Sequence, residues 1–500
     1  MSGIKKLAGQ TIWYGASTIA ARFINYLLTP YLTGGVLLVS SYGEMSLVYA
    51  AIPLLNVLFT YGFETAYFRF AQRKEHEQNI YSTAALSLMC STILFSILLW
   101  TFHESLAKFA GVPENPLLIK LSILVIAFDS LSTLPFARLR QEGRPVKFAV
   151  IRIAGILINI GLTVFFLSYC PKLIANDPGH WVGLFYSSTT NPVTYIVVAN
   201  VVQSAFTLLL LLKEIGEIQL KFDAKLWKEM LVYSMPLVIA GLGGMINETF
   251  DRIMLSWWVP GTEVFKQEQV GIYSACYKLS ILITLFIQAF RMGAEPFFFK
   301  QAQGDNPQRT YARVMKFFVM TVTMMFLVVA LFLPLWRYFV GPKFWGGLVV
   351  VPILLLANIF LGVYYNLSIW YKLGNKTRAG AYLTLIGALV TLIINFVFIP
   401  RYGFMACAWA TFFCYGTMMV LSFIWGQKEY RIPYATKKLV AYIIIVVVLF
   451  LIHLFISYLL PNMVIQTVLA VVLLALYVSF LLLVEKKEFQ KLPIVGKYLR

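Results

Sequence analysis

The sequence is built from apolar runs of about 20 residues, the length that an α-helix needs to cross a bilayer, and short segments with charge, proline or glycine separate them. Only 13% of the residues are charged, against about 25% in soluble domains, so little of the chain remains for a domain outside the membrane. The pattern predicts an all-α, polytopic membrane protein of about 14 transmembrane helices. We expect these helices near residues 9–33, 43–67, 80–102, 117–137, 148–170, 192–212, 231–258, 270–290, 314–336, 346–370, 380–399, 404–426, 439–460 and 463–484.

Basic residues are distributed unevenly between the segments that join these helices. If the N-terminus is cytoplasmic, most of the 41 Lys and Arg residues lie in inner segments, the side where such residues collect. The sequence therefore predicts that both termini are cytoplasmic. The basic residues expected in outer loops are Lys108, Lys172, Lys266, Arg337, Lys343 and Arg401.

The net charge of +19 would suggest nucleic acid as a partner in a soluble chain. Here the basic residues occupy the gaps between apolar runs, as topology signals do, so we expect no nucleic-acid partner. The five cysteines form no CxxC pair and the four histidines are scattered. Disulfides, a metal site, a bound cofactor and histidine-based catalysis are therefore not expected.

Some cations lie within the predicted helices rather than between them. A charge at the centre of a span costs roughly 2.5 to 3.5 kcal/mol on insertion, so such residues usually line a polar cavity or a substrate path. Lys120 and Arg152 are close enough to helix ends for their charges to reach the membrane surface, and we expect both to do so. The cations within helices are Arg22, Lys120, Arg152, Arg252 and Lys278.

Arg252 has acidic neighbours on its own helix. Glu248 precedes it by one turn, and Asp251 is adjacent in sequence. Both local neutralisation and contact with a substrate are compatible with this pattern.

Arg22 and Lys278 differ because no Asp or Glu stands one turn away on the same helix. Their counter-charge must come from another helix or from a ligand. We interpret both as cavity-lining residues, and the alternative is a buried structural pair with Glu44, Glu64 or Asp129.

Carboxylates are absent from a long stretch of the C-terminal half, between Asp305 and Glu429. A pore that selects cations normally presents carboxylates, so this region does not suit one. The basic excess within the earlier helices favours an anionic substrate instead. The last two predicted helices carry no Asp, Glu, Lys or Arg, which is typical of lipid-facing additions.

A short internal repeat relates the two halves of the chain. Tyr42 to Ser46 resembles Val270 to Ser274, and Ala21 to Phe23 resembles Asp251 to Ile253, with an offset of about 230 residues in both places. The repeat predicts two pseudo-symmetric six-helix lobes with a substrate site between them. We expect an N-terminal lobe at 1–213, a cytoplasmic linker at 214–229, a C-terminal lobe at 230–427, and two further helices with a basic tail at 428–500.

The sequence resembles the polysaccharide-type lipid-linked oligosaccharide flippases of the multidrug/oligosaccharidyl-lipid/polysaccharide exporter superfamily. Each matching motif is short, but their order and the helix count agree across nearly the whole chain. The motifs are Tyr61 to Phe70, Arg138 to Pro145, Tyr233 to Leu237, Phe250 to Leu255, and Val270 to Ser274 with Lys278.

The resemblance implies a non-enzymatic, multi-pass protein of the bacterial inner membrane. Such a protein moves an undecaprenyl-pyrophosphate-linked glycan unit from the cytoplasmic to the periplasmic leaflet by alternating access, for cell-surface polysaccharides such as lipopolysaccharide. The implied partners are the lipid-linked oligosaccharide, membrane lipid, and glycan polymerase and export machinery.

A diphosphate is compact and anionic, and arginine binds phosphate oxygens in a bidentate manner. Arg22 and Lys278 are therefore the expected substrate-binding residues, with Arg252 next. Coupling to an ion or balancing of the empty cavity is a hypothesis for the acidic residues Glu64, Asp251 and Glu248. The coupling ion stays open between H⁺, Na⁺ and the membrane potential alone.

Three alternatives remain. A lipid II flippase would share the fold and the need for cavity cations. A drug exporter of the same superfamily would need cavity carboxylates. A membrane glycan polymerase or ligase would need a catalytic outer loop, whereas the longest expected outer segment, 171–191, holds one Asp and one His.

Overall fold

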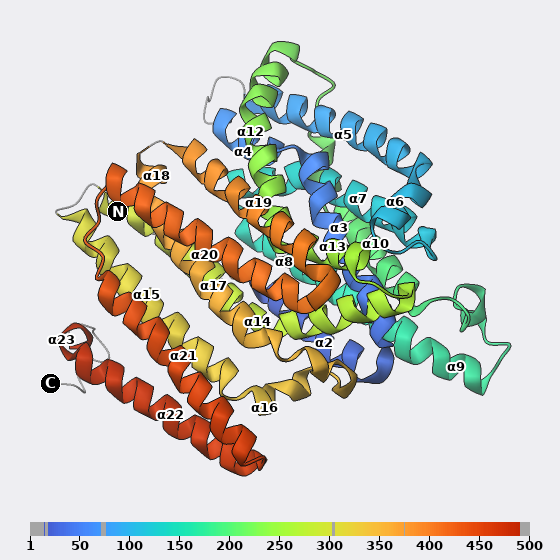
Figure 1. Cartoon of the computed structure of the whole chain (residues 1–500). Helices are drawn as coiled ribbons and strands as arrows, with labels where there is room; N and C mark the ends of the chain where they lie inside the picture. Colours follow the sequence, from blue (N-terminus) through green and yellow to red (C-terminus); the bar gives the residue numbers. More distant parts are fainter. Residues whose placement is uncertain (1–14, 16–18, 72–76, 303–305, 375, 491–500) are drawn as a thin grey trace. The chain divides into compact units, whose positions relative to one another are not determined.

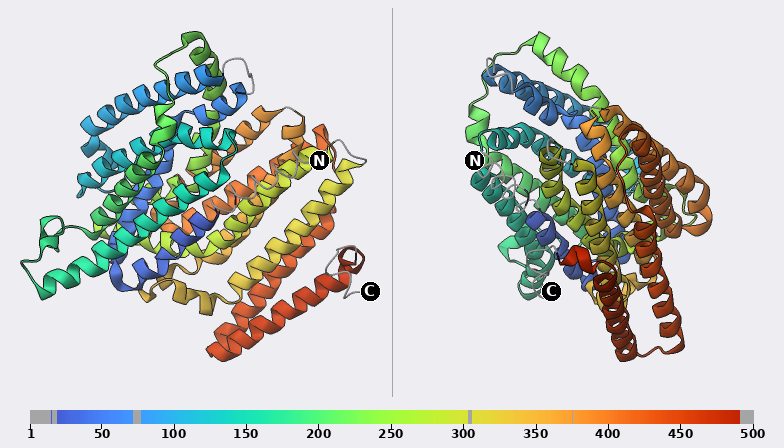
Figure 2. Two further views of the ribbon diagram at one scale, coloured as in Figure 1. Left: turned by 180° about the vertical axis from the view of Figure 1, so that it is seen from behind. Right: turned by 90° about the vertical axis from the view of Figure 1, so that its left-hand side faces the viewer.

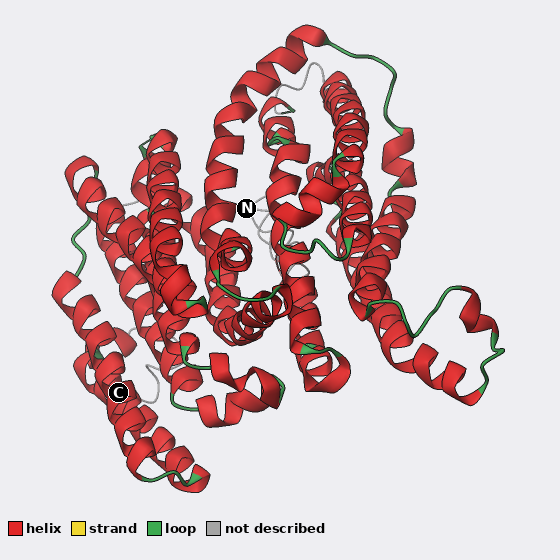
Figure 3. Cartoon of the chain, turned by 45° about the vertical axis from the view of Figure 1, so that its right-hand side comes forward, coloured by secondary structure: helices red, strands yellow, loops and turns green. Residues whose placement is uncertain are grey.

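The computed structural model describes residues 15, 19–71, 77–302, 306–374 and 376–490 of the chain. Within these residues every regular element is a helix (Figure 3). Thirteen helical spans in this part are long and apolar enough to cross a membrane, which confirms the predicted all-α, polytopic fold. The first predicted helix, near 9–33, falls largely outside the described residues, and its described part is helical at 19–26 and 28–31.

The long helices contain the predicted apolar runs (Figure 1), but the helix predicted at 270–290 extends over 263–301, and the one predicted at 43–67 breaks at the left-handed residues Tyr61 and Gly62. They are α3 (Val39–Thr60), α4 (Phe63–Phe70), α5 (Glu77–Thr101), α7 (Pro116–Gln141), α8 (Pro145–Val164), α10 (Pro192–Leu210), α12 (Ala224–Glu248), α13 (Phe250–Trp258), α14 (Glu263–Gln301), α15 (Pro307–Ala330), α17 (Val350–Leu367), α19 (Thr377–Tyr402), α20 (Phe404–Glu429), α21 (Thr436–Leu459) and α22 (Met463–Val484).

Shorter elements connect or extend them. They are α2 (Leu28–Tyr31), η1 (Leu32–Val36), α6 (His103–Phe109), η3 (Phe165–Tyr169), α9 (Cys170–Asn176), η4 (Trp181–Leu184), α11 (Leu212–Gly216), α16 (Leu333–Trp336), η5 (Arg337–Phe339), η6 (Pro342–Gly347), α18 (Ile369–Leu373) and α23 (Lys486–Phe489).

The predicted helix at 231–258 differs from the observed structure at its start and in its middle. α12 begins at Ala224 because the Asp223 carboxylate caps it, accepting hydrogen bonds from the backbone N–H groups of Lys225 and Leu226 at 3.0 Å each. Its first turns carry lysines, so an apolar run does not reveal them. The helix then breaks at Thr249, whose backbone is not helical, and α13 follows.

The chain divides into two compact units. Unit 1 comprises Met1–Ala275 and Thr377–Cys414, and unit 2 comprises Cys276–Lys376 and Tyr415–Arg500. The division passes through α14 and α20. These units differ in extent from the predicted lobes at 1–213 and 230–427, which stay a prediction.

In unit 1, α3 and α14 approach to backbone contact at two glycines. A Cβ atom on Gly43 would overlap the carbonyl oxygen of Gln267, and one on Gly271 would overlap that of Val39. In both helices the obstructing carbonyl lies one turn before the glycine, so the contact is reciprocal, as expected where two repeats meet near a two-fold axis. These are the glycines that the sequence repeat aligns.

In unit 2, α21 and α22 pack side by side (Figure 2), and a buried carboxylate just after α22 holds them to α15. Glu485 accepts hydrogen bonds from Lys316 at 2.7 Å, Lys438 at 2.8 Å and Tyr442 at 2.7 Å. Burial alone would raise the pKa of Glu485, but these donors lower it to about 2. Polar contacts of Glu485 therefore hold one end of the last two helices, α21 and α22, against α15.

Candidate functional site

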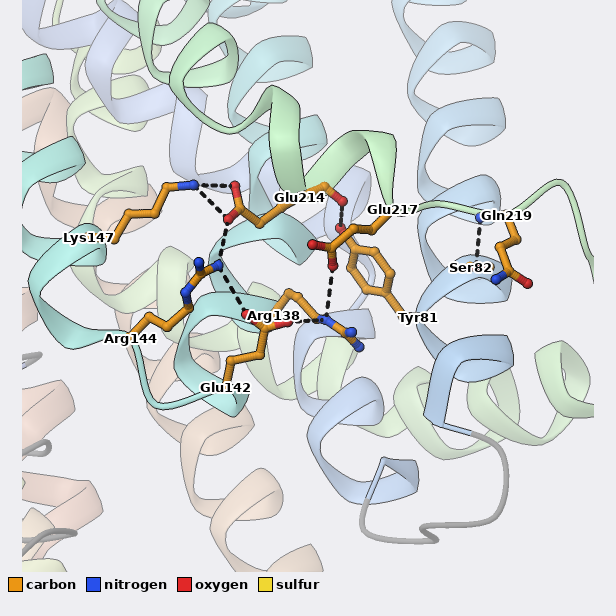
Figure 4. A network of polar contacts seen from close by, with 9 residues as sticks. All are labelled: Tyr81, Ser82, Arg138, Glu142, Arg144, Lys147, Glu214, Glu217 and Gln219. Carbon is orange, nitrogen blue, oxygen red and sulfur yellow. Dashed lines mark hydrogen bonds and ion pairs between the residues drawn. The ribbon is translucent and has the colours of Figure 1, made fainter.

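An ion-pair network closes one end of unit 1, where α7, α8 and α11 meet (Figure 4). Its centre is Glu214, which is fully buried and lies 2.6 Å from the Lys147 ammonium and 3.2 Å from the Arg144 guanidinium. Arg138 lies 2.7 Å from Glu142 and 3.6 Å from Glu217. Three cations therefore face three carboxylates, and the charges of the network balance.

The same end of the unit contains the predicted coupling residue Glu64. Its carboxylate forms an ion pair with Arg140 of α7, and the Arg140 guanidinium stacks 4.8 Å from the ring centroid of Phe68. The left-handed backbone of Gly62, with φ of 74°, separates α3 from α4 and places Glu64 in the first turn of α4. The structure thus gives Glu64 a protein partner, and coupling stays a hypothesis.

A second charged cluster lies well inside the membrane-spanning part of unit 1. It brings together Arg22 of the first helix, Asp129 of α7, Arg152 of α8 and Ser204 of α10. Ser204 donates a hydrogen bond of 2.8 Å to Asp129, while Arg152 is attracted by Asp129 and repelled by the nearby charge of Arg22. The cluster therefore places two guanidinium groups near one another, and Asp129 faces one of them, Arg152.

Both arginines of this Arg22–Arg152 cluster are accessible. The Arg152 guanidinium stacks 4.4 Å from the ring centroid of Phe136. A guanidinium at this depth would not face hydrocarbon, because a charge there costs roughly 2.5 to 3.5 kcal/mol.

The predicted Arg252 lies in a third cluster, at the start of α13. Its guanidinium contacts the buried carboxylate of Asp251 at 3.0 Å and the backbone carbonyl of Glu248 at 2.9 Å. Asp251 also accepts a hydrogen bond of 2.6 Å from Tyr273. These contacts correspond to the local neutralisation that the sequence left open, and the side chain of Glu248 is exposed.

The predicted residue Lys278 lies in α14, in unit 2, and is half-buried. Arg22 and Arg152 belong to unit 1. The structure therefore brings Arg22 together with Arg152, and a shared role of Arg22 with Lys278 stays a prediction.

The three carboxylates considered as structural partners of Arg22 or Lys278 have other contacts. Glu44 accepts hydrogen bonds from the side-chain amides of Asn115 and Asn191, the latter at 2.6 Å. Glu64 pairs with Arg140, and Asp129 is bound by Ser204.

Sequence reasoning assigned Arg152 to the membrane surface and so missed its place in the cluster. The signal that could have revealed it is the lone Asp129 in the preceding helix, since a carboxylate within a span usually has a cationic partner. Within the described part of the chain, no three His, Cys, Asp or Glu residues are grouped as metal ligands would be.

Comparisons with known proteins agree on the architecture. A family model described as polysaccharide biosynthesis protein matches residues 7–302. The chain is similar to a structure of the lipid II flippase MurJ in an inward closed conformation, with a TM-score of 0.67, 15% identity, and coverage of 94% of this chain and 99% of that chain. No curated protein matches.

The chain is also similar to a multidrug resistance MATE family transporter of the MOP superfamily. The inward-facing conformation gives a TM-score of 0.61 at 14% identity, covering 82% of this chain and 94% of that chain. The outward-facing conformation gives 0.57 at 16% identity, covering 84% and 94%. At these identities the likeness is one of fold.

Proposed function

The chain belongs to the polysaccharide biosynthesis protein family, and on this premise we propose that it is a flippase for a polyprenyl-diphosphate-linked glycan unit. The protein would carry the unit from the cytoplasmic to the periplasmic leaflet of a bacterial inner membrane, with both termini in the cytoplasm. No bond is made or broken in this step, so the proposed activity is transport rather than catalysis.

The observation that carries the proposal is the proximity of two arginines, Arg22 and Arg152, within the membrane-spanning part of unit 1. Both side chains are exposed. Arginine binds phosphate oxygens in bidentate geometry, and charge-assisted hydrogen bonds are strongest where water is scarce. A diphosphate offers several such oxygens to a pair of arginines, and Lys278 of unit 2 stays a proposed substrate-binding residue.

The reciprocal contact between Gly43 and Gly271 supports the proposal of alternating access. The charge distribution assigns the ends of α3 and α14 that touch there to the periplasmic side. Release of the glycan on that side would require these ends to separate. Small residues at a helix crossing allow a close but separable contact.

A lipid II flippase is the second candidate, because the structure of MurJ is similar over nearly the whole chain. Its lipid also carries a diphosphate, so the Arg22–Arg152 cluster suits both substrates. The two are distinguished by the glycan, which only a transport assay reports.

The test is reconstitution in proteoliposomes that contain either an undecaprenyl-diphosphate oligosaccharide or lipid II. Transbilayer movement is followed by the accessibility of the glycan to an external enzyme, with and without Na⁺ and pH gradients. We expect movement of the oligosaccharide lipid, and loss of it in Arg22→Ala. Arg22→Lys should restore part of the activity, because a point charge replaces a planar fork.

The matched control is Lys120→Ala, which removes a cation of the same unit that stacks 5.7 Å from the ring centroid of Trp100, away from the cluster. This variant should transport normally. Normal transport by Arg22→Ala would refute the role of the cluster. Movement of lipid II alone would replace the proposed substrate with that of the second candidate.

A further inference from the structure

Glu44, in the second turn of α3, is a buried carboxylate outside the charged clusters described above. The residue is 3% exposed, and in the described part of the chain no Lys or Arg forms an ion pair with it. Its two oxygens instead accept one hydrogen bond each, Oε1 from the amide of Asn115 and Oε2 from that of Asn191 at 2.6 Å. A carboxylate buried without a cation depends on such hydrogen bonds, because its desolvation is otherwise uncompensated.

Both asparagines stand at helix starts. Asn115 directly precedes α7 and Asn191 directly precedes α10, and a proline occupies the first turn of each helix. The side-chain oxygen of Asn191 accepts a hydrogen bond of 2.9 Å from the backbone N–H of Val193, so this residue also caps α10. Acidic side chains are stabilising beside helix starts, where backbone N–H groups lack partners. Glu44 therefore joins the start of α3 to the starts of α7 and α10.

The neighbour of Glu44 in sequence is Gly43, at the backbone contact between α3 and the start of α14. Gly43 and Gly271 allow this contact because neither carries a Cβ atom. The two contacts of α3 differ in kind: charge-assisted hydrogen bonds hold it to α7 and α10, whereas glycines meet α14. Charge-assisted hydrogen bonds are about twice as strong as neutral ones, while small residues at a helix crossing separate readily. All of these residues belong to unit 1.

We propose that Glu44 is a positioning residue for a periplasmic gate, which consists of the contact between α3 and α14 at Gly43 and Gly271. Glu44 keeps α3 on α7 and α10, so that the start of α14 moves when the gate opens. The inference rests on the proposed function, because a transporter that works by alternating access needs such a gate. The charge distribution assigns this end of the helices to the periplasm.

The two hydrogen bonds to Glu44 run in the same direction. Both amides donate, so both carboxylate oxygens act as acceptors. Asn191 is held in this orientation because its own oxygen caps α10. Asn191→Asp would keep the cap, since Asp is among the preferred capping residues, but would set a second carboxylate against Glu44.

Asn191→Asp should therefore break the link between α3 and α10. Adding Glu44→Gln should restore it, because the new amide donates to the new carboxylate while its oxygen still accepts from Asn115. Glu44→Gln alone should have a smaller effect, since the oxygen of Asn115 has no partner among the described residues and the Asn115 amide can turn over. Rescue of one substitution by the other reports a direct coupling, which two independent losses of stability do not produce.

Two distances in the full-length protein report which helix moves. Spin labels replace Leu38 and Ser188 to follow α3 against α10, and Leu38 and Val264 to follow α3 against α14, in a background that lacks the native cysteines. All three positions are exposed. The protein is placed in nanodiscs with and without an undecaprenyl-diphosphate oligosaccharide. A mildly alkaline pH prevents the two carboxylates of Asn191→Asp from sharing a proton.

In the wild type we expect the lipid to change the distance between α3 and α14 and to leave the distance between α3 and α10 constant. In Asn191→Asp the distance between α3 and α10 should increase, and transport in proteoliposomes should fall several-fold. The double variant should recover both.

Four results would overturn the proposal. A change between α3 and α10 in the wild type would identify α3 as the moving helix, and a constant distance between α3 and α14 would remove the gate. An unchanged distance between α3 and α10 in Asn191→Asp would show that Glu44 does not hold these helices together. A double variant that stays impaired would show that the hydrogen bond between the two positions is not the cause.

The matched control is Asn462→Asp, which makes the same substitution at the start of α22 in unit 2. Asn462 is exposed and caps α22 by accepting hydrogen bonds from the backbone N–H groups of Val464 and Ile465. Both distances and the transport rate should stay at their wild-type values. A loss of transport in this control equal to that in Asn191→Asp would show an effect of added charge alone and overturn the assignment.

The two proposals fail in different ways. Transport by the wild type that is unaffected in Asn191→Asp would retain the flippase and refute the role of Glu44. A wild type that moves no lipid-linked glycan, but whose gate opens at α14 and whose link between α3 and α10 is broken and rescued as expected, would retain the role of Glu44 and refute the flippase.

Discussion

Two charged clusters share helices α7 and α8 and differ in charge balance. At the helix ends, the network around Glu214 sets three cations against three carboxylates, with the central carboxylate fully buried. Further into the same helices, Asp129 of α7 faces Arg152 of α8, and Arg22 of the first helix lies near Arg152. In the first cluster each cation is paired with a carboxylate, and the second is the proposed anion site.

An ion pair within a membrane span is therefore not by itself a sign of function. Arg252, which the sequence grouped with Arg22, is held by Asp251 and by the backbone of Glu248. Arg152, which the sequence assigned to the surface, faces Asp129 instead. Charge balance and accessibility together distinguish an ion pair that stabilises the fold from a candidate binding site.

The largest expected effect separates the two clusters directly. Arg152→Gln should lower transport about 10- to 100-fold, because a hydrogen bond to a charged group contributes about 1.5 to 3 kcal/mol and about 1.4 kcal/mol corresponds to a factor of ten. Its amount in the membrane should stay near that of the wild type. Lys147→Gln, from the balanced network, should instead retain transport per folded molecule. Transport rates in proteoliposomes, divided by the amount of folded protein, decide the comparison.

A smaller effect is expected at the glycine contact of α3 and α14. Gly43→Ala should cost about 1 to 3 kcal/mol in the state with touching helices, because the added Cβ overlaps the Gln267 carbonyl. The distance between spin labels near the starts of the two helices should increase. Gly161→Ala is the control, since no atom lies within 4 Å of its Cβ position. An unchanged distance in Gly43→Ala would contradict the contact.

Substitutions in the balanced network around Glu214 should lower the stability of the protein rather than its transport rate. Glu214→Gln leaves Lys147 and Arg144 with a neutral partner, and both can turn toward water, so we expect a loss of about 1 to 3 kcal/mol. Thermal unfolding in detergent measures this loss. The control is Glu263→Gln, whose pair with Lys266 is partly exposed and contributes about 0 to 1 kcal/mol. Equal melting temperatures of the two variants would remove the distinction between buried and exposed pairs.

The smallest effect appears only in acid and concerns Glu485 of unit 2. Its pKa is lowered from 4.5 to about 2, so the stabilisation is complete above pH 4.5 and declines as the pH falls toward 2. Glu485→Gln should therefore be less stable than the wild type near neutral pH, and the difference should shrink across that window. Melting temperatures of both proteins at several pH values measure the difference. A constant difference down to pH 2 would show that the carboxylate charge does not stabilise the contact.

The spans, the overall fold class and the list of charged residues within helices follow from the sequence. Hydropathy and charge are properties of the residues themselves, and a bilayer sorts helices by them. The first residue of a helix is harder to predict from the sequence where a capping side chain, rather than hydropathy, sets it. Asp223 at the start of α12 is the example.

Only the tertiary structure decided which charges meet. Whether Arg152 reaches the surface or turns toward Asp129 and Arg22 depends on the rotation and depth of α7 and α8, which the apolar pattern of either helix leaves undetermined. The hydrogen bonds of Glu44 with Asn115 and Asn191 likewise need the starts of three helices that are distant in sequence. Pairing across helices depends on packing, which is a property of the whole unit, and so the network around Glu214 and the Arg22–Arg152 cluster could be told apart only in three dimensions.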